Sequence, residues 1–343
     1  MDHVDAVVIG AGQAGLSTAH HLGRLGVGQV VLDAGDRPGG AWRERWPSLR
    51  LGAVHGIHDL PGLPLGEVDT ARPAAEVVGE YFARYERTFA FPVHRPVRVR
   101  AVRDVGQRLL VETTERSWAA RAVVNATGTW ENPFLPHYPG RDRFAGRQLH
   151  TADYRSAEEF RGERVLVVGG GISAVEHLVE LAGIASTTWV TRRPPELSAA
   201  EFTPERGRAA VAEVERRVRA GLPPGSVVSA TGLPPTPAVR RAEELGVLHR
   251  RPMFDRITPG GVVWPDGTAE EVDVILWATG FRPVLGHLAP LRLRAPGGGI
   301  QLDGTRAVAE PRLHLVGYGP SASTIGANRA GRTAAREIRS LIA

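Results

Sequence analysis

The sequence of 343 residues predicts an α/β fold in which one strand–turn–helix unit occurs twice. Two glycine-rich turns begin at Gly10 and Gly169, each directly after a short apolar run. Two other apolar runs end in Ala-Thr-Gly, at residues 126–128 and 278–280. The glycine-rich turns are 159 residues apart and the Ala-Thr-Gly tripeptides 152 apart, so two independent features repeat at nearly the same spacing. We interpret this agreement as two copies of one nucleotide-binding unit.

The first unit has every part of a dinucleotide-binding turn. Residues 5–9 predict a buried parallel strand, residues 16–25 a helix, and residues 29–32 a second strand that ends in Asp33. The glycines between strand and helix allow a tight turn and let the backbone approach a pyrophosphate at a helix N-terminus, although glycines can also serve the turn alone. Asp33, 23 residues after Gly10, can accept hydrogen bonds from a ribose. The predicted contacts of this turn are Gly10, Gly12, Gln13, Ala14, Gly15, Asp33 and Ala34.

Two further segments of the first unit are expected at the same ligand. The stretch from Arg37 to Trp42 contains a Gly-Gly pair that lets the chain turn back over a bound cofactor. The strand 121–125 leads into the first Ala-Thr-Gly. Residues 46–65 predict either loops that wall an active site or an ordinary surface loop. The residues predicted to bind here are Gly40, Trp42, Thr127 and Gly128.

The second unit differs from the first in its charge. Its glycine-rich turn follows the strand 164–168, and its second strand ends in Arg192-Arg193. Arg192 lies 23 residues after Gly169, the spacing at which the first unit has Asp33. A guanidinium suits the 2′-phosphate of NADPH, although arginines at a strand end can also be merely solvated. The predicted contacts of this unit are Gly169, Gly171, Ile172, Ser173, Arg192, Arg193, Thr279 and Gly280.

The end of the chain is expected to return to the first unit. A strand near residues 313–316, a turn with Gly319 and a helix from about 325 to 342 would bring a helix N-terminus to the cofactor, and Gly319 is a predicted contact. Residues 199–221 predict a charged helical excursion inside the second unit, either a lid or partner surface or a solvated helix. We therefore predict two Rossmann-like domains. Residues 1–160 and 281–343 form the first, and residues 161–280 form a second that is inserted into it.

The composition excludes several classes of function. The chain has no cysteine, which excludes disulfides, thiolate metal sites, cysteine nucleophiles and Cys-x-x-Cys redox pairs. It also has no lysine, which excludes Walker-type phosphate loops and Schiff-base chemistry. The net charge of +5 comes from dispersed arginines rather than one basic stripe, so no nucleic-acid partner is expected. No apolar stretch is long enough for a membrane span and no leader is evident, which predicts a cytoplasmic protein.

With these residues assembled, the sequence resembles the flavin-containing monooxygenases, in particular the short bacterial members of the class B flavoprotein monooxygenases. The specific part is F-x-G-x-x-x-H-x-x-x-[YFW], which Phe144, Gly146, His150 and Tyr154 fit directly before the second glycine-rich turn. The resemblance implies FAD in the first domain and NADPH in the second. It also implies that NADPH reduces FAD by hydride transfer, that a flavin hydroperoxide forms with O2, and that small sulfides, amines or ketones are oxygenated.

The resemblance leaves the catalytic residues open, with His150 and His55 as candidates. We expect His150 to hold the two cofactors in register rather than to transfer a proton. Gly52 stands near the place where some family members carry an asparagine beside the flavin, so a hydrogen bond to the oxygenated cofactor is missing there. His55 and His58 lie close enough in the sequence to compensate, although a single loop histidine is more often incidental.

Two other functions remain open from the sequence. One is an NAD(P)H oxidase or ferredoxin-reductase-like flavoprotein that makes no oxygenated product. The other is a redox-sensing flavoprotein, which would not need two complete nucleotide sites. The sequence does not identify the organic substrate. It also leaves the oligomeric state open, with a homodimer as one option.

Overall fold

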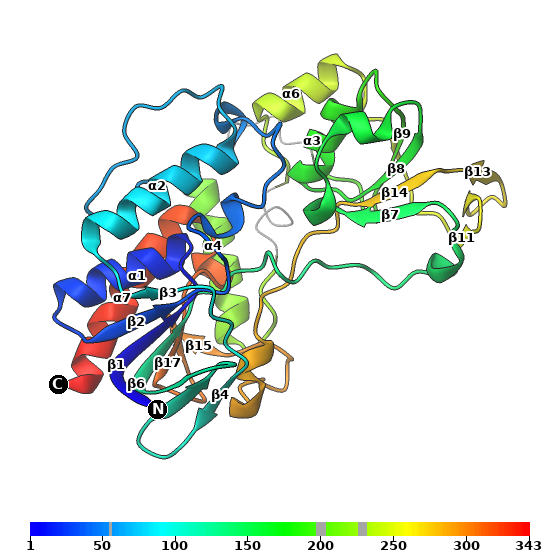
Figure 1. Cartoon of the computed structure of the whole chain (residues 1–343). Helices are drawn as coiled ribbons and strands as arrows, with labels where there is room; N and C mark the ends of the chain where they lie inside the picture. The colour runs from blue at the N-terminus through cyan, green and yellow to red at the C-terminus, as the bar shows by residue number, and fades with distance from the viewer. Residues whose placement is uncertain (55–56, 197–203, 226–231) are drawn as a thin grey trace.

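The computed structural model describes residues 1–54, 57–196, 204–225 and 232–343 and has two lobes (Figure 1). Within these residues the first lobe is built on a nine-stranded sheet. Strand β1 (Asp2–Ile9) lies at its centre and runs parallel to the strands on either side. The sheet order is β15-β16-β17-β6-β1-β2-β3, with the β4-β5 hairpin attached to β6. Its other strands are β2 (Gln29–Leu32), β3 (Val93–His94), β4 (Ala101–Asp104), β5 (Leu109–Glu112), β6 (Ser117–Asn125), β15 (Leu302–Asp303), β16 (Arg306–Ala307) and β17 (Leu313–Leu315).

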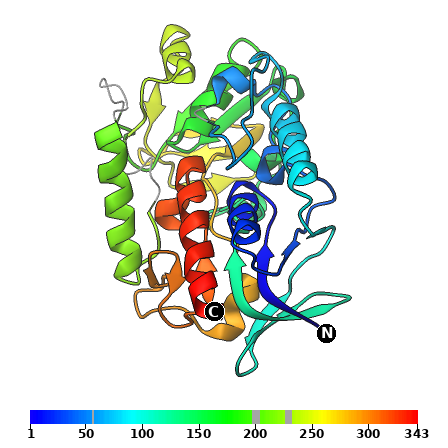
Figure 2. The same cartoon turned by 90° about the vertical axis from the view of Figure 1, so that its left-hand side faces the viewer.

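Strand β1 is apolar throughout its buried half because both of its faces are covered. Ala6 and Val8 belong to one hydrophobic cluster, which includes the helices of the first lobe. Val7 and Ile9 belong to another on the opposite face of the sheet. Such continuous burial is typical of the parallel strands of doubly wound folds. The helices on the first face are α1 (Gln13–Arg24), α2 (Ala74–Phe89) and α7 (Thr324–Ile342), and Figure 2 shows α1 beside α7.

The second lobe contains a five-stranded parallel sheet with the order β10-β9-β8-β14-β7 among the described residues. A small antiparallel sheet, β11-β12-β13, comes directly before β14 in the chain, and the turn around Asp266 and Gly267 joins its strands β12 and β13. The strands of this lobe are β7 (Arg147–His150), β8 (Arg164–Val168), β9 (Ser186–Val190), β10 (Arg250–Arg251), β11 (Arg256–Thr258), β12 (Gly261–Val263), β13 (Ala269–Glu271) and β14 (Val274–Trp277). Its helices are α3 (Ile172–Leu181) and α6 (Pro237–Glu244).

Short 3-10 helices form many of the connections. They are η1 (Gly40–Trp42), η2 (Leu51–Ala53), η3 (Arg141–Arg143), η4 (Thr151–Asp153), η5 (Ala157–Phe160), η6 (Gly286–Leu291) and η7 (Gly319–Ser321). Among the helices that the structure describes, none combines the length and the apolar character that a membrane span requires.

The predicted internal repeat is visible in the contacts of the two glycine-rich turns. A Cβ atom on Gly10 would lie 2.6 Å from the carbonyl oxygen of Ala126, and one on Gly169 would lie 2.1 Å from that of Ala278. In each unit, therefore, the first glycine of the turn touches the alanine of the Ala-Thr-Gly tripeptide. The two pairs of motifs belong together for this reason, and the predicted α/β class with two Rossmann-like units is confirmed.

Two segments pack in the other lobe than the one to which the predicted domain boundaries assign them. Strand β7 falls within residues 1–160, yet it pairs with β14 in the second sheet. Helix α4 (Pro204–Arg219) falls within residues 161–280, yet it packs against η7 beside α7 of the first lobe, as Figure 2 shows. Val214 and Val218 are buried in that contact, so α4 is a docked helix and not a solvated excursion. The assignment of one cofactor to each domain stays a prediction.

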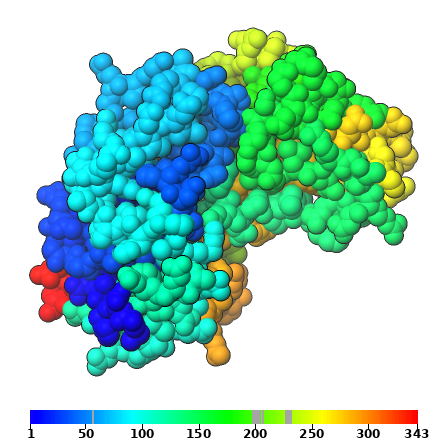
Figure 3. Space-filling view, viewed as in Figure 1, coloured from blue at the N-terminus to red at the C-terminus, as the bar shows by residue number. Residues whose placement is uncertain are grey.

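The two lobes are joined by a carboxylate on α3. One Glu180 oxygen accepts a hydrogen bond from the Trp46 indole N–H at 2.7 Å. The other accepts from the Ser48 hydroxyl and the Tyr154 hydroxyl, both at 2.8 Å. Trp46 and Tyr154 are almost completely buried, so Glu180 satisfies donors that water cannot reach. The space-filling view shows the two lobes in contact in the upper half of the molecule, with the second lobe projecting to the right above a hollow beside the first (Figure 3).

We predict that Glu180→Ala destabilises the protein by about 2–4 kcal/mol, because it leaves the buried Trp46 and Tyr154 donors without an acceptor. The free energy of unfolding from urea titration measures the effect. Glu243→Ala on α6, where the side chain is exposed, is the control and is expected to change it by less than about 0.5 kcal/mol. An equal loss in both variants would show that Glu180 does not join the lobes.

Candidate functional site

A cavity of about 740 Å³ opens at the carboxyl ends of β1, β2 and β6 in the first lobe. Ligand sites of doubly wound folds occur at this edge of the sheet. The cavity is walled by the first glycine-rich turn, by η1 and by the segment after β6. The predicted residues that line it are Gly10, Gly12, Gln13, Ala14, Asp33, Ala34, Gly40, Trp42, Thr127 and Gly128.

The glycine-rich turn leaves the first turn of α1 open to the cavity. Gly12 is the N-cap of α1 and has no side chain to accept hydrogen bonds from the helix N–H groups, and no acidic residue lies in the first turn. A Cβ on Gly12 would meet no protein atom within 4 Å, whereas one on Gly40 would lie 2.9 Å from the Gly12 Cα. Free N–H groups with the positive end of a helix dipole fit a pyrophosphate. Gly15 faces away from the cavity and packs on Gly10.

Asp33 is fixed by its neighbours and lines one end of the cavity. Its Oδ2 accepts from the Ala11 N–H at 3.0 Å and its Oδ1 from the Gly35 N–H at 2.7 Å. The Arg95 guanidinium also lies 3.3 Å from Oδ2, and it is held by Glu86 through two hydrogen bonds of 2.8 Å. The carboxylate therefore has acceptor capacity left mainly on Oδ1, which fits one ribose hydroxyl. Arg95, 62 residues away along the chain, gave no local signal in the sequence.

A series of hydrogen bonds between buried and half-buried polar side chains forms another wall of the cavity. The Thr127 hydroxyl donates to the Val284 carbonyl at 2.7 Å, and it accepts from the Asn125 amide at 3.1 Å. The His287 Nε2 donates in turn to the Asn125 Oδ1 at 2.7 Å. Burial lowers the pKa of His287 to about 4, so this ring is neutral at physiological pH. His287 lines the cavity but lies in no recognisable motif, and the sequence did not reveal it.

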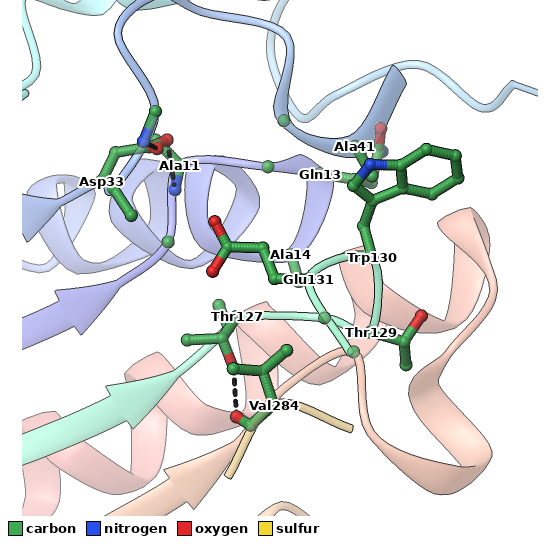
Figure 4. A pocket seen from close by; sticks show the side chains of 18 of the residues that line it. Ala11, Gln13, Ala14, Asp33, Ala41, Thr127, Thr129, Trp130, Glu131 and Val284 are labelled. Carbon is green, nitrogen blue, oxygen red and sulfur yellow. Dashed lines mark hydrogen bonds between the residues drawn. The ribbon is translucent and has the colours of Figure 1, made fainter. Parts of the chain in front are cut away.

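Figure 4 shows how the labelled side chains are arranged around this cavity. Asp33 and its hydrogen bond to Ala11 lie at one side, and Trp130 lies at the other, near Ala41 and Gln13. Glu131 points into the space between them. Its carboxylate is held at the rim by Arg98 through hydrogen bonds of 2.6 and 2.9 Å. The cavity thus has one end at Asp33 whose carboxylate suits a ribose, and an opposite end at Trp130 that is aromatic.

His150 is held by backbone groups at both ring nitrogens. Its Nε2 lies 2.9 Å from the Gly280 carbonyl, and its Nδ1 accepts from the Ala152 N–H at 3.1 Å. The ring is buried, and this burial lowers its pKa. A neutral ring with both nitrogens occupied has no free site for a proton, which favours the predicted positional role over proton transfer.

The segment Phe144–Tyr154, which connects the first unit to the second glycine-rich turn, packs as its residue types suggest. Tyr154 is completely buried and bonded to Glu180, and Phe144 packs at the edge of the second-lobe core. A Cβ on Gly146 would lie 2.3 Å from the Asp273 carbonyl oxygen, so only glycine fits there. Two loop residues were also predicted to lie near the flavin, His55 and Gly52. His55 lies outside the described residues, and Gly52 bonds to the Thr70 carbonyl through its N–H at 2.9 Å.

The second glycine-rich turn lies in the other lobe, away from the cavity. Gly169 follows β8 in the left-handed region with φ +150°, and Gly171 is the open N-cap of α3, which begins with Ile172 and Ser173. Arg192 and Arg193 follow β9 and are exposed. No carboxylate lies within ion-pair distance of either among the described residues. Arg250 on β10 donates to the Thr191 hydroxyl at 2.7 Å, so a third guanidinium lies at this strand end.

The remaining predicted contacts are distributed between the lobes. The Thr279 hydroxyl donates to the Phe134 carbonyl, and the Gly280 carbonyl meets His150. Gly319 faces Val218 of α4, with its Cβ position 2.9 Å from the Val218 Cγ2, and it does not line the cavity. Gly317 lines it instead, together with Ser323 and Thr324 at the start of α7. The expected approach of a helix N-terminus is thus present at Ser323 and Thr324, and the glycine that lines the cavity lies two residues before the predicted one.

The site can be compared with known proteins. A sequence profile described as pyridine nucleotide-disulphide oxidoreductase matches residues 7–206. The solved flavin-containing monooxygenase from Stenotrophomonas maltophilia is 40% identical, with all of both chains covered and a TM-score of 0.86. An uncharacterized CzcO-like oxidoreductase of Geobacillus kaustophilus is 31% identical over 53% of each chain. A ferredoxin–NADP reductase of Thermus thermophilus is 28% identical over 92% of this chain and 84% of its own.

The curated relatives with the strongest matches are longer than the matched region. The chain spans about half of their length, between 52% and 53% for three CzcO-type oxidoreductases. The solved Stenotrophomonas structure, by contrast, is matched along its entire length.

The second and third glycines of the first turn, Gly12 and Gly15, provide a test of the cavity. A Cβ on Gly15 would lie 1.8 Å from the Gly10 carbonyl oxygen, so Gly15→Ala is expected to destabilise the fold by about 3 kcal/mol or more. Gly12→Ala meets no protein atom and is expected to change stability by less than about 1 kcal/mol, yet to weaken FAD binding strongly. Urea unfolding of the FAD-free proteins and fluorescence titration with FAD measure both effects. Normal FAD affinity in Gly12→Ala would contradict the placement of a pyrophosphate at this turn.

Proposed function

The chain belongs to the pyridine nucleotide-disulphide oxidoreductase family and within it to the flavin-containing monooxygenases, and from this premise we propose that it is an NADPH-dependent flavin monooxygenase of small organic compounds. The observation that carries the proposal is the match to the Stenotrophomonas enzyme along both chains, at 40% identity and a TM-score of 0.86. In the proposed reaction one oxygen atom of O2 goes to a sulfide, amine or ketone. The other leaves as water, which takes up the hydride of NADPH and one proton from solution.

The proposed place of FAD is the cavity of the first lobe. The Gly10–Gly12 turn and the open N-terminus of α1 would hold its pyrophosphate, Asp33 one hydroxyl of its ribose, and Gly40 would let the chain pass close over it. When bound, FAD supplies the chemistry by taking a hydride from NADPH and then activating O2. The protein orients the cofactor and excludes water. Trp42 and Trp130 provide apolar surface at the far end of the cavity for this purpose.

The proposed place of NADPH is the second glycine-rich turn. Gly171 leaves the N-terminus of α3 open for a pyrophosphate, as Gly12 does in the first lobe. Arg192 and Arg193 are exposed at the strand end that corresponds to Asp33, where a 2′-phosphate would need donors. Glu180 ties α3 and Tyr154 to Trp46 of the first lobe, and His150 contacts the Gly280 carbonyl at the end of the second unit. These contacts would hold the NADPH turn at a fixed position relative to the flavin.

A second function has its own support. An NAD(P)H oxidase or ferredoxin-reductase-like activity is favoured by the similarity to the Thermus ferredoxin–NADP reductase across 92% of the chain. Glycine at position 52, in place of a side chain able to hydrogen bond, favours it too. The proposal further includes a cytoplasmic location, where NADPH is available. A homodimer stays a prediction.

The proposed reaction is tested by its product balance. The FAD-loaded protein is mixed with NADPH, O2 and thioanisole, and the sulfoxide, hydrogen peroxide and consumed NADPH are quantified. A monooxygenase is expected to form sulfoxide in an amount comparable to the NADPH consumed. Hydrogen peroxide in an amount equal to the NADPH consumed would instead establish the oxidase, provided that neither thioanisole nor any of a panel of amines and ketones is oxygenated.

For the choice of cofactor, we predict that Arg192→Ala raises the Michaelis constant for NADPH by roughly 10- to 100-fold, because charge-assisted hydrogen bonds to the 2′-phosphate are lost. The Michaelis constant for NADH is expected to change little. Arg256→Ala, which removes another exposed arginine of the second lobe, is the control for net charge. Equal effects of Arg192→Ala on NADPH and NADH would mean that the 2′-phosphate is bound elsewhere.

A further inference from the structure

Arg45 lines the cavity with a guanidinium that has no acidic partner. Among the described residues, no carboxylate oxygen lies within 4.0 Å of it and no hydrogen bond involves its side chain. Its Nε is buried and lacks an acceptor altogether. An arginine cannot lose its proton in a protein, so this positive charge persists despite burial. A buried donor of this kind is rare in native structures and calls for a partner.

The surroundings of Arg45 are aromatic rather than acidic. Its guanidinium lies 4.6 Å from the ring centroid of Trp130 and 5.7 Å from that of Trp42. Trp130 stacks in turn on Phe281 at 4.9 Å. Ring faces stabilise a cation but accept no conventional hydrogen bond, so the N–H groups of Arg45 that face the cavity stay available.

The other charged residues of the cavity wall are already paired. Arg43 contacts Asp36 and Glu44 at 2.8 and 2.6 Å. Arg98 contacts Glu131 at 2.6 Å. The two remaining acids also have partners, Asp33 with Ala11, Gly35 and Arg95, and Asp153 with the His150 N–H at 3.0 Å. Within the described part of the wall, Arg45 is therefore the cation without an ion pair, whereas the acid Asp153 is held by a backbone N–H.

One carboxyl of the second lobe acts on Arg45 from a longer distance. Glu176 on α3 influences it electrostatically without coming into ion-pair contact. Burial, together with the charge of Glu180, raises the pKa of Glu176 to about 7 against the opposing effect of Arg45. Near neutral pH this carboxyl is only partly ionised, so it does not fully balance the guanidinium.

The position of Arg45 separates it from the expected phosphates. It lies at the aromatic end of the cavity, beside α3 and Trp130, while Asp33 marks the ribose end. The proposed flavin pyrophosphate contacts the Gly10–Gly12 turn, and the proposed 2′-phosphate of NADPH contacts Arg192 in the other lobe. Arg45 therefore faces the end of the cavity where the reacting ring of the flavin would lie.

We infer that Arg45 is a substrate-binding residue that selects small organic compounds carrying a carboxylate. Its planar guanidinium can form two parallel hydrogen bonds to a carboxylate, and Trp42 and Trp130 can contact the apolar part of the same molecule. This inference rests on the proposed function, because it names the substrate class of the same site.

The test compares an acid with its neutral ester. The probes are 4-(methylthio)benzoate and its methyl ester, which share the sulfide and differ in the charge. Binding to the FAD-loaded protein is measured without NADPH, from the change in the flavin absorption spectrum, so the result does not depend on turnover. The variants are Arg45→Gln, Arg45→Lys and, as a control for net charge, Arg100→Gln, whose side chain is exposed and outside the cavity. The FAD content of each protein is measured in parallel.

We expect the unmodified protein and Arg100→Gln to bind the acid at least roughly ten-fold more tightly than the ester, and Arg45→Gln to lose this preference with normal FAD content. Arg45→Lys is expected to keep part of it, because the charge remains and the bidentate geometry does not. An acid-to-ester ratio near one in the unmodified protein overturns the inference. So does a loss of FAD in Arg45→Gln with an unchanged ratio, which assigns Arg45 to a cofactor phosphate. A retained acid preference without any oxygenated product would refute the proposed function and leave the binding site standing.

Discussion

The close contact between the first glycine of each glycine-rich turn and the neighbouring Ala-Thr-Gly strand is the constraint on which the structure depends. Gly10 adopts φ +102° and touches the Ala126 carbonyl, and Gly169 adopts φ +150° and touches that of Ala278. A side chain at either glycine would push the two strand ends apart. The contact brings the turn, the helix N-terminus and the second strand end to one edge of the sheet. The cavity of the first lobe lies at that edge.

The two units would be independent without the segment that connects them. His150 contacts the Gly280 carbonyl, which belongs to the Ala-Thr-Gly tripeptide of the second unit. Four residues later, Tyr154 contacts Glu180 on the helix of the same unit, and Glu180 reaches back to Trp46 of the first lobe. One short stretch of chain therefore contacts both ends of the second glycine-rich unit and, through Glu180, the first lobe. This explains why a family signature made of ordinary residues occurs directly before the second turn.

The sequence predicted the parts of this structure that depend on local patterns. Glycine spacing, apolar runs and Asp33 are all read within about thirty residues, and they led to the fold class and to most of the cavity wall. The contributions of Arg95 and His287 depend on pairings across 62 and 162 residues, and nothing in the local sequence indicates such partners. Helix α4 is a second case in which the local sequence did not indicate the tertiary contact. Its charged sequence suggested a solvated helix, while the few apolar residues Val214 and Val218 decide where it docks.

The absence of lysine gives the unpaired charge in the cavity a particular meaning. A buried lysine can lose its proton when no partner is present, so an unpaired ammonium in a dry site becomes neutral. Arginine does not have this option, and its charge must be balanced by a neighbour, by water or by a ligand. In this cavity the neighbouring rings of Trp42 and Trp130 contribute only their faces, and Glu176 is partly protonated near neutral pH. An anionic ligand would supply what the protein does not. Binding it would also draw the proton equilibrium of Glu176 toward the neutral form, because a second negative charge beside Arg45 raises the pKa of that carboxyl further.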